Sequence, residues 1–317
     1  MILKNIKTKK MYYNEVLDEW LLNRKEKIKE SSYIKYETII EKLIKPELGN
    51  YILKKLNDKI IVDFFKKDKI LKASDSIRKT TLIIIKSSIN YALDKKYIKK
   101  FNNIKIKLKK PKTKIVYFTK TEQAILDNYL RNNLNIRNIG ILLTLYTGLR
   151  IGELCSLKWN DIDFINKTLS VNRTVQRIKN KNKNSQNKTI LITNTPKTEH
   201  SKRIIPLPIF IIELLEEYKS KGENYIFTNS NLPKDPRTYE KYFSNILKRN
   251  GIRNLNFHTL RHTFATRSRE AGIDIKVLSE ILGHSSYHIT QEIYVHISVD
   301  FKRDSINSLV NYITTNN

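Results

Sequence analysis

Three segments of the chain place titratable side chains among apolar residues, where burying a charge costs free energy unless the charge serves a site. The first is TGLRIGEL at residues 147–154, in which Arg150 follows a helix that we expect to end at Gly148. Glu153 stands three residues further on, on the same face of the next helix, so its carboxylate can hold the guanidinium in place. An ordinary surface Arg–Glu pair has the same spacing, and this segment alone does not decide between the two.

The second segment is HTLRHTFAT at residues 258–266, which we expect on a helix. His258, Arg261 and His262 are three or four residues apart and therefore face the same way. Two histidines at this spacing can bind zinc, but the zincin motif needs a glutamate where Thr259 stands, and the arginine would put a fixed charge beside the metal. An anion is the better ligand, because a guanidinium binds phosphate through two hydrogen bonds.

The third segment is LGHSSYHITQEIYVHI at residues 282–297, with His284 after a glycine turn and Tyr294 ten residues later. Taken alone, they would be a capping histidine and a core tyrosine. Two arginines and two histidines around one phosphate would neutralise a pentacoordinate transition state, and a tyrosine hydroxyl would attack it. Lys197, between two predicted strands, is placed to protonate the leaving 5′-oxygen, although in isolation it is one lysine among many.

The elements that position these residues follow from hydrophobic periodicity. Three β-branched runs of strand length, at residues 169–175, 189–193 and 203–206, predict one small antiparallel sheet among helices. The polar tract KNKNKNSQNK is the expected hairpin tip between the first two strands. The expected helices are 125–130 with a start near Thr119, the run IGILLTLYT, 209–218, 238–250, 259–271, 275–282 and a last one from residue 290 onward.

Upstream of these segments, four apolar stripes at helical spacing predict a small helical domain with basic outer faces. The stripes span residues 16–21, 33–44, 60–65 and 82–93, and Pro46 and Gly49 are expected to end the second helix.

A basic stretch follows, because the chain has ten lysines and no acidic residue between Lys95 and Lys114. We interpret it as a linker that follows a phosphate backbone, the alternative being a solvated tether. The predicted organisation is a basic tail at 1–10, a helical domain at 11–102, a basic linker at 103–117 and a second domain at 118–317 that carries the candidate site residues.

The composition favours a nucleic acid partner. The 317 residues include 60 Lys and Arg against 31 Asp and Glu, a formal net charge of +29. Such a surplus repels itself unless a polyanion neutralises it, and codon bias would explain many lysines but not the excess over acids. No run reaches the roughly 18 apolar residues of a membrane span, the N-terminus has no signal peptide, and the single cysteine, Cys155, fits a reducing compartment. We therefore expect a cytoplasmic protein without a membrane partner.

Together these segments resemble the tyrosine recombinase family, the phage-integrase-like site-specific recombinases. TGLRIGEL, the lysine between two strands, HTLRHTFAT, LGHSS and the tyrosine-bearing helix occur in the family's order and at family-like spacings. The resemblance extends from about residue 11 to the end. It implies a mainly α fold with a small antiparallel β-sheet, in which an N-terminal helical core-binding (SAM-like) domain precedes an α+β tyrosine recombinase catalytic domain.

The resemblance also implies roles for the phosphate-binding residues. Arg150 and Arg261 would clamp the scissile phosphate, Glu153 would support Arg150, and His284 would hydrogen-bond a phosphate oxygen. Because a phosphotyrosyl diester conserves the energy of the cleaved bond, we expect neither metal nor ATP nor any other cofactor.

The remaining roles concern proton transfer and attack. By resemblance, Lys197 would be the general acid, His258 would assist proton transfer at the nucleophile, and Tyr294 would form the 3′-phosphotyrosyl bond. Of the other tyrosines after the glycine turn, Tyr287 lies too close to the turn and Tyr312 lies in the tail. We leave out of the site, as packing or surface residues, His200, His262, His288 and His296.

The family's assembly would be a homo-tetramer on double-stranded DNA at specific recombination sites, with strands exchanged through a Holliday junction. Directionality or DNA-bending factors would be further partners, in the nucleoid of a prokaryotic host. An apolar stripe on a short terminal helix fits this assembly, since relatives dock such a helix on a neighbouring protomer; packing within the same subunit is the alternative. The stripe consists of Ile306, Leu309, Val310 and Ile313. Only about ten residues precede the first helix, so we expect no arm-binding domain.

The leading interpretation is a site-specific recombinase that integrates or excises a mobile element. A chromosome or plasmid dimer resolvase of the same family and a type IB topoisomerase-like enzyme are the enzymatic alternatives. The separate helical domain and the terminal helix favour recombination over relaxation. A catalytically inactive DNA-binding protein is disfavoured because every expected active-site position is filled, and an RNA-binding protein is a further alternative.

Overall fold

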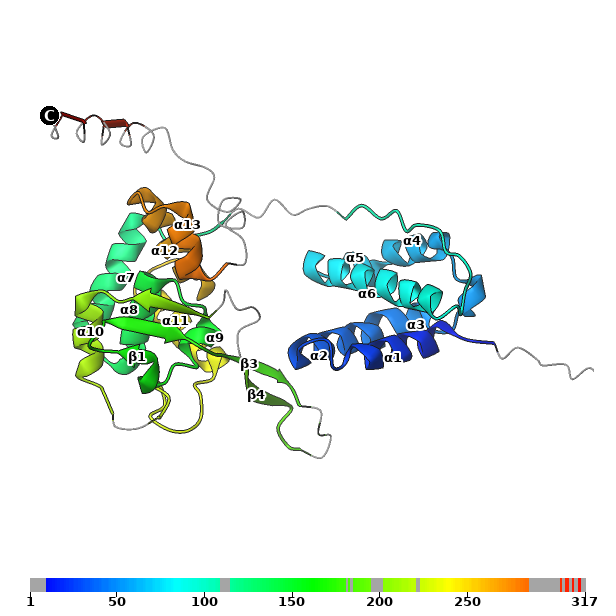
Figure 1. The fold of residues 1–317 in the computed structure, drawn as a ribbon, viewed down its shortest axis with the longest axis horizontal. Coiled ribbons are helices and arrows are strands. Elements are labelled where there is room, and N and C mark those ends of the chain that lie inside the picture. The colour runs from blue at the N-terminus through cyan, green and yellow to red at the C-terminus, as the bar shows by residue number, and fades with distance from the viewer. Residues whose placement is uncertain are drawn as a thin grey trace, which may run out of the picture. The chain divides into compact units, whose positions relative to one another are not determined.

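The computed structural model describes residues 10–108, 115–180, 182, 185–194, 202–220 and 223–284, together with six residues between 303 and 314. The chain divides into two compact units, residues 1–113 and 114–317, and each is described by itself (Figure 1). No helix among the described residues is long and apolar enough to cross a membrane.

The first unit is helical and has its own core, in which Tyr13 is fully buried and its hydroxyl lies 2.8 Å from the hydroxyl of Ser88. The four predicted helices are present, and a short additional helix, α5, lies between the third and the fourth. The elements are α1 (Tyr13–Arg24), α2 (Glu30–Ile39), the π-helical turn η1 (Ile40–Ile44), α3 (Lys45–Leu48), η2 (Leu53–Lys55), α4 (Asp58–Lys66), α5 (Asp68–Leu71) and α6 (Asp75–Asp94).

The prediction that Pro46 helps to end the second helix is wrong. The chain remains helical through the π-helical turn η1 and then α3, and it stops at Leu48, before Gly49. Pro46 occupies the first turn of α3, where its missing N–H removes no hydrogen bond that α3 itself needs. The wider turn thus lets the helix pass the proline.

Part of the predicted linker packs against the first unit. Residues 104–108 alternate, with Ile104 buried, Lys105 and Lys107 exposed, and Ile106 and Leu108 partly buried against the core. This period of two is typical of an extended segment with one face on a protein surface. The lysines are therefore directed to solvent, where they are available to a polyanion.

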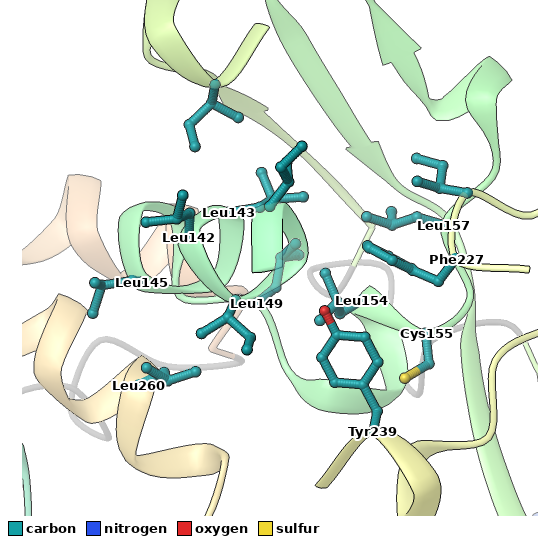
Figure 2. Packing of buried hydrophobic residues seen from close by; sticks show 14 of the residues in the cluster. Leu142, Leu143, Leu145, Leu149, Leu154, Cys155, Leu157, Phe227, Tyr239 and Leu260 are labelled. Carbon is teal, nitrogen blue, oxygen red and sulfur yellow. The ribbon is translucent and has the colours of Figure 1, made fainter. Parts of the chain in front are cut away.

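The second unit is built around α8 (Ile136–Thr147), whose residues are almost all buried. Figure 2 shows Leu142, Leu143 and Leu145 of this helix in one cluster with Leu149 and Leu260, and Tyr239 of the same cluster lies beside Leu154. The predicted helices of this unit are confirmed as far as the described residues reach. The other elements are α7 (Lys120–Asn132), α9 (Ile151–Leu154), η3 (Trp159–Asp161), α10 (Ile209–Glu216), α11 (Pro236–Arg249), α12 (His258–Glu270) and α13 (Ile275–Leu282).

The strands form two small antiparallel sheets in place of the single predicted one. β1 (Ile162–Asp163), β2 (Thr168–Val171) and β5 (Arg203–Pro206) form one, and the hairpin of β3 (Thr174–Lys179) and β4 (Thr189–Asn194) forms the other. The polar tract connects β3 and β4, as predicted.

The predicted strand 169–175 is divided at Asn172 and Arg173. The side-chain amide of Asn172 donates to the Asp161 carboxylate over 3.2 Å. The Arg173 guanidinium donates to the same carboxylate over 3.0 and 3.1 Å. These contacts anchor the turn between β2 and β3, and they depend on tertiary structure rather than on local propensity.

Gly148 ends α8 in the left-handed conformation, with φ of +68°. A Cβ atom there would lie 2.6 Å from Phe264 and 2.8 Å from Leu282. We expect Gly148→Ala to lower the free energy of unfolding by about 2–4 kcal/mol, from backbone strain plus overpacking. Gly251→Ala is a matched control, since its φ is +66° but nothing lies within 4 Å of the added atom, and it should cost about 1 kcal/mol. Equal losses in denaturant unfolding would contradict the packing argument.

Candidate active site

Arg150 and Glu153 form the predicted pair at the start of α9. The Arg150 guanidinium donates from Nη1 to Oε1 of Glu153 over 2.7 Å, and the Arg150 backbone N–H donates to Oε2 over 3.0 Å. The Glu153 side chain is 4% exposed and that of Arg150 is 36% exposed. A buried carboxylate therefore holds a guanidinium that still reaches the surface, which an ordinary surface pair does not do.

A second arginine, Arg203 at the start of β5, binds the same carboxylate. Its Nη1 and Nη2 donate to the two oxygens of Glu153 over 3.2 and 2.9 Å. Burial raises the pKa of Glu153, but the charges and hydrogen bonds of Arg203 and Arg150 outweigh burial and lower the pKa to about 2. Glu153 is therefore ionised throughout the physiological range.

Arg261 connects α12 to two other segments of the site. The side chain is 3% exposed, and its Nη1 donates to the carbonyl of Gly148 over 2.8 Å. Its Nη2 donates to the carbonyl of Leu282 over 2.6 Å. One buried guanidinium thus joins the end of α8, the end of α13 and the helix of HTLRHTFAT.

His284 follows the left-handed Gly283 that ends α13, and its backbone N–H donates to Ser279 over 3.1 Å. Arg150 Nη2 lies 3.4 Å from the carbonyl oxygen of Gly283, to which it donates a long hydrogen bond. The pKa of His284 falls to about 3, because the half-buried ring is desolvated and because Arg261, Arg150 and Arg203 are near. The glycine turn therefore brings His284 among the arginines.

His258, at the first position of α12, joins the same cluster. Partial burial and the nearby His262, Arg261 and Arg150 lower its pKa to about 4, although part of its surface remains exposed. The ring of His262 lies edge-on to it, with 4.7 Å between centroids. His262, which the sequence analysis left out, therefore lies beside the site, and burial and Arg261 lower its pKa.

The described residues therefore bring five of the seven predicted site residues together: Arg150, Glu153, His258, Arg261 and His284. The other two, Lys197 and Tyr294, lie outside the described residues. The sequence analysis missed Arg203, whose only local signal was an arginine at the start of a predicted strand. With three arginines, one carboxylate and neutral imidazoles, this cluster is suited to bind an anion.

The histidine pKa values predict a measurable titration. In the free protein at 25 °C, the ring protons of His258 should titrate near pH 4 and those of His284 near pH 3, well below the usual 6.5. Because the unfolded chain takes up these protons first, both histidines reduce stability as the pH falls below about 6.5 and have no such effect above it. NMR titration, assigned with His258→Gln and His284→Gln, tests this, and ordinary values near 6.5 would contradict the clustering.

Known proteins are similar to this chain in sequence and in fold. A model of the phage integrase family matches residues 115–300, and a model of the phage integrase N-terminal SAM-like domain matches residues 12–67. The chain therefore belongs to the phage integrase family. This membership confirms the resemblance inferred from the sequence.

A curated relative, a tyrosine recombinase XerC-like protein of Caldanaerobacter subterraneus subsp. tengcongensis, is 33% identical over 256 residues. The alignment covers 71% of this chain and 63% of that protein, so the chain spans less than two thirds of the relative's length.

Two solved structures have a similar fold. The Tn1549 transposon integrase in complex with transposon right end DNA aligns with a TM-score of 0.77 at 21% identity, over 95% of this chain and 100% of that one. A lambda integrase tetramer bound to a Holliday junction aligns with a TM-score of 0.63 at 22% identity, over 87% and 78%. They confirm the predicted fold class, a mainly α chain with a helical SAM-like domain before an α+β domain, although two small antiparallel sheets stand where one was predicted.

Proposed function

We propose that the protein is a site-specific DNA recombinase that cuts and rejoins DNA through a 3′-phosphotyrosyl intermediate. The observation that carries the proposal is the bridge made by Arg261, whose guanidinium joins Gly148 and Leu282 and so unites the Arg150 turn with the His284 turn. Three separated segments thereby supply cations and imidazoles to one place. The most suitable anion is a phosphodiester, because the chain belongs to the phage integrase family and carries a large positive net charge.

In the proposed reaction, Tyr294 Oη attacks the scissile phosphorus and the bond to the 5′-oxygen breaks. Arg150 and Arg261 bind the non-bridging oxygens, and His284 donates a hydrogen bond to one of them. His258 accepts the tyrosine proton, for which its neutral state at pH 7 is suitable, and Lys197 gives a proton to the leaving 5′-oxygen. The new diester keeps the bond energy, so rejoining by a 5′-hydroxyl needs neither ATP nor a metal.

We further propose that the enzyme acts as a tetramer on paired DNA sites, since the lambda integrase with a similar fold forms a tetramer bound to a Holliday junction. Support within this chain comes from helical residues of the tail. Ile306, Val310 and Ile313 are 60%, 51% and 53% exposed, so these apolar side chains offer a surface for docking. Docking on a neighbouring protomer would cover them.

The proposed partners are double-stranded DNA at specific sites and accessory factors that bend DNA or set direction, in the nucleoid of a prokaryotic host. The transposon integrase with a similar fold favours a mobile element. The XerC-like name of the curated relative favours dimer resolution as the second candidate, with the same chemistry.

Covalent selection tests the proposal and needs no DNA site to be chosen in advance. The purified chain is mixed with fragmented genomic DNA from its host, the reaction is stopped with detergent, and strands attached to protein are sequenced. We expect 3′ ends within one recurring motif. Attachment without sequence preference would indicate a topoisomerase, and no attachment would indicate a binding protein. A motif at the ends of an inserted element supports integration or excision, whereas a single chromosomal locus supports dimer resolution.

A further inference from the structure

Arg203 holds together three parts of the second unit. Its backbone pairs with Val171 in the ladder of β2 and β5, which fixes the residue in a sheet. Its guanidinium binds both oxygens of Glu153, and its Nε donates to the carbonyl of Ile281 over 2.5 Å. The side chain is 5% exposed, so its contacts are shielded from solvent.

The two hydrogen bonds from the Arg203 guanidinium determine the orientation of the Glu153 carboxylate relative to Arg150. Both guanidiniums donate to Oε1 of Glu153, over 2.7 Å from Arg150 and 3.2 Å from Arg203. Oε2 accepts from Arg203 and from the Arg150 backbone N–H. Because two parallel hydrogen bonds restrict the rotation of a carboxylate, Arg203 fixes its plane and thus the direction in which Arg150 points.

The same arginine packs under the turn that carries His284. A Cβ atom on Gly283, where φ is +64°, would lie 3.0 Å from Cδ and 3.1 Å from Nη1 of Arg203. The Gly283 turn is therefore in close contact with the Arg203 side chain, and the hydrogen bond from Arg203 Nε to Ile281 also attaches the last turn of α13 to it. Arg150 also reaches this turn through the carbonyl of Gly283.

We propose that Arg203 is a positioning residue of the reaction, which aligns Arg150 through Glu153 and His284 through the 281–284 turn for contact with the non-bridging oxygens of the scissile phosphate. This inference rests on the proposed function. Arg203 itself is buried behind Glu153 and transfers no proton. It contributes by pre-organising two phosphate-binding groups. Loss of comparable supporting contacts slows a reaction by roughly 10- to 100-fold.

The test measures single-turnover cleavage by Arg203→Lys on three versions of the selected DNA site. On the ordinary phosphodiester we expect a loss of roughly 30-fold, with DNA binding within about 3-fold of the wild type. A methylphosphonate at the scissile position carries no charge, so alignment of the phosphate-binding groups matters less and the loss should fall to about 3-fold. A 5′-phosphorothiolate has a leaving group that needs no general acid, and there the loss should stay near 30-fold.

Controls separate positioning from general damage. Arg173→Lys changes a similar guanidinium fork, on Asp161, which takes no part in the site, and it should leave all three rates unchanged. Arg203→Gln is a second variant, which keeps a donor but loses the charge, and it should show the same dependence on substrate. Each variant is assayed at least about 10 °C below its own melting temperature.

The outcomes are distinct. An equal loss on the phosphodiester and the methylphosphonate, or full rescue by the phosphorothiolate alone, would overturn the positioning role. Cleavage of the phosphodiester within about 3-fold of the wild-type rate would also overturn it. If the wild-type protein attaches to no DNA, the proposed function fails instead.

Discussion

Tyr294→Phe is expected to abolish covalent attachment of the protein to DNA while leaving site binding unchanged. Removal of the phenolic oxygen leaves no nucleophile, so the cleavage rate should fall by roughly 10⁴-fold or more. Binding depends on many phosphate contacts made by a chain of net charge +29, and one hydroxyl contributes little to it. Gel analysis of detergent-stable adducts and a mobility-shift assay, on the same DNA, measure the two quantities.

The matched controls are Tyr287→Phe and Tyr312→Phe, which replace the other two tyrosines after His284. Both variants should form adducts at rates within about 3-fold of the wild type, because neither side chain has a role in attack. Adducts that persist in Tyr294→Phe, or that disappear in Tyr287→Phe instead, would assign the nucleophile to another residue.

Arg261→Lys should produce the largest effect among the described residues. A lysine ammonium lacks the planar fork that lets one side chain donate to both Gly148 and Leu282 in fixed directions. We expect cleavage to slow by roughly 10²- to 10³-fold and the free energy of unfolding to fall by about 1–3 kcal/mol. Single-turnover kinetics and denaturant unfolding measure these changes.

Arg267→Lys is the control on the same helix. Arg267 also donates to a backbone carbonyl, that of Phe118 over 2.8 Å, and its side-chain partners Gln123 and Glu270 are not residues of the site. Its substitution should reduce stability without slowing cleavage more than about 3-fold. If both variants slow cleavage equally, the effect of Arg261 would be one of folding rather than of phosphate binding.

Local patterns predicted most helices of the fold. The run IGILLTLYT followed by glycine predicts the buried α8 and its end at Gly148, because apolar periodicity and the left-handed cap are both local properties. The passage of the helix beyond Pro46 was not predicted, since it depends on a π-helical turn. The division of the strand at Asn172 was also missed, because it depends on Asp161, which lies eleven residues earlier.

In the candidate site, too, contacts between residues close in the sequence were predicted and contacts between distant residues were not. Arg150 and Glu153 lie within one turn of helix, so their pairing follows from spacing alone. Arg203 and Glu153 are fifty residues apart, and only the folded chain brings them together. His262 stands four residues after His258, so its spacing does place it on the same face of α12, and the structure confirms that the two rings are neighbours. It was left out of the predicted site because histidines of this kind are more often packing or surface residues.

The most direct test of the central claim is a structure of the protein with the two cleaved halves of its DNA site and vanadate, which mimics the pentacoordinate phosphorus. The account predicts a bond from the Tyr294 oxygen to vanadium, with both guanidiniums, of Arg150 and Arg261, within hydrogen-bonding distance of the equatorial oxygens. Vanadium bound to a different side chain, or either guanidinium directed away from it, would contradict the account.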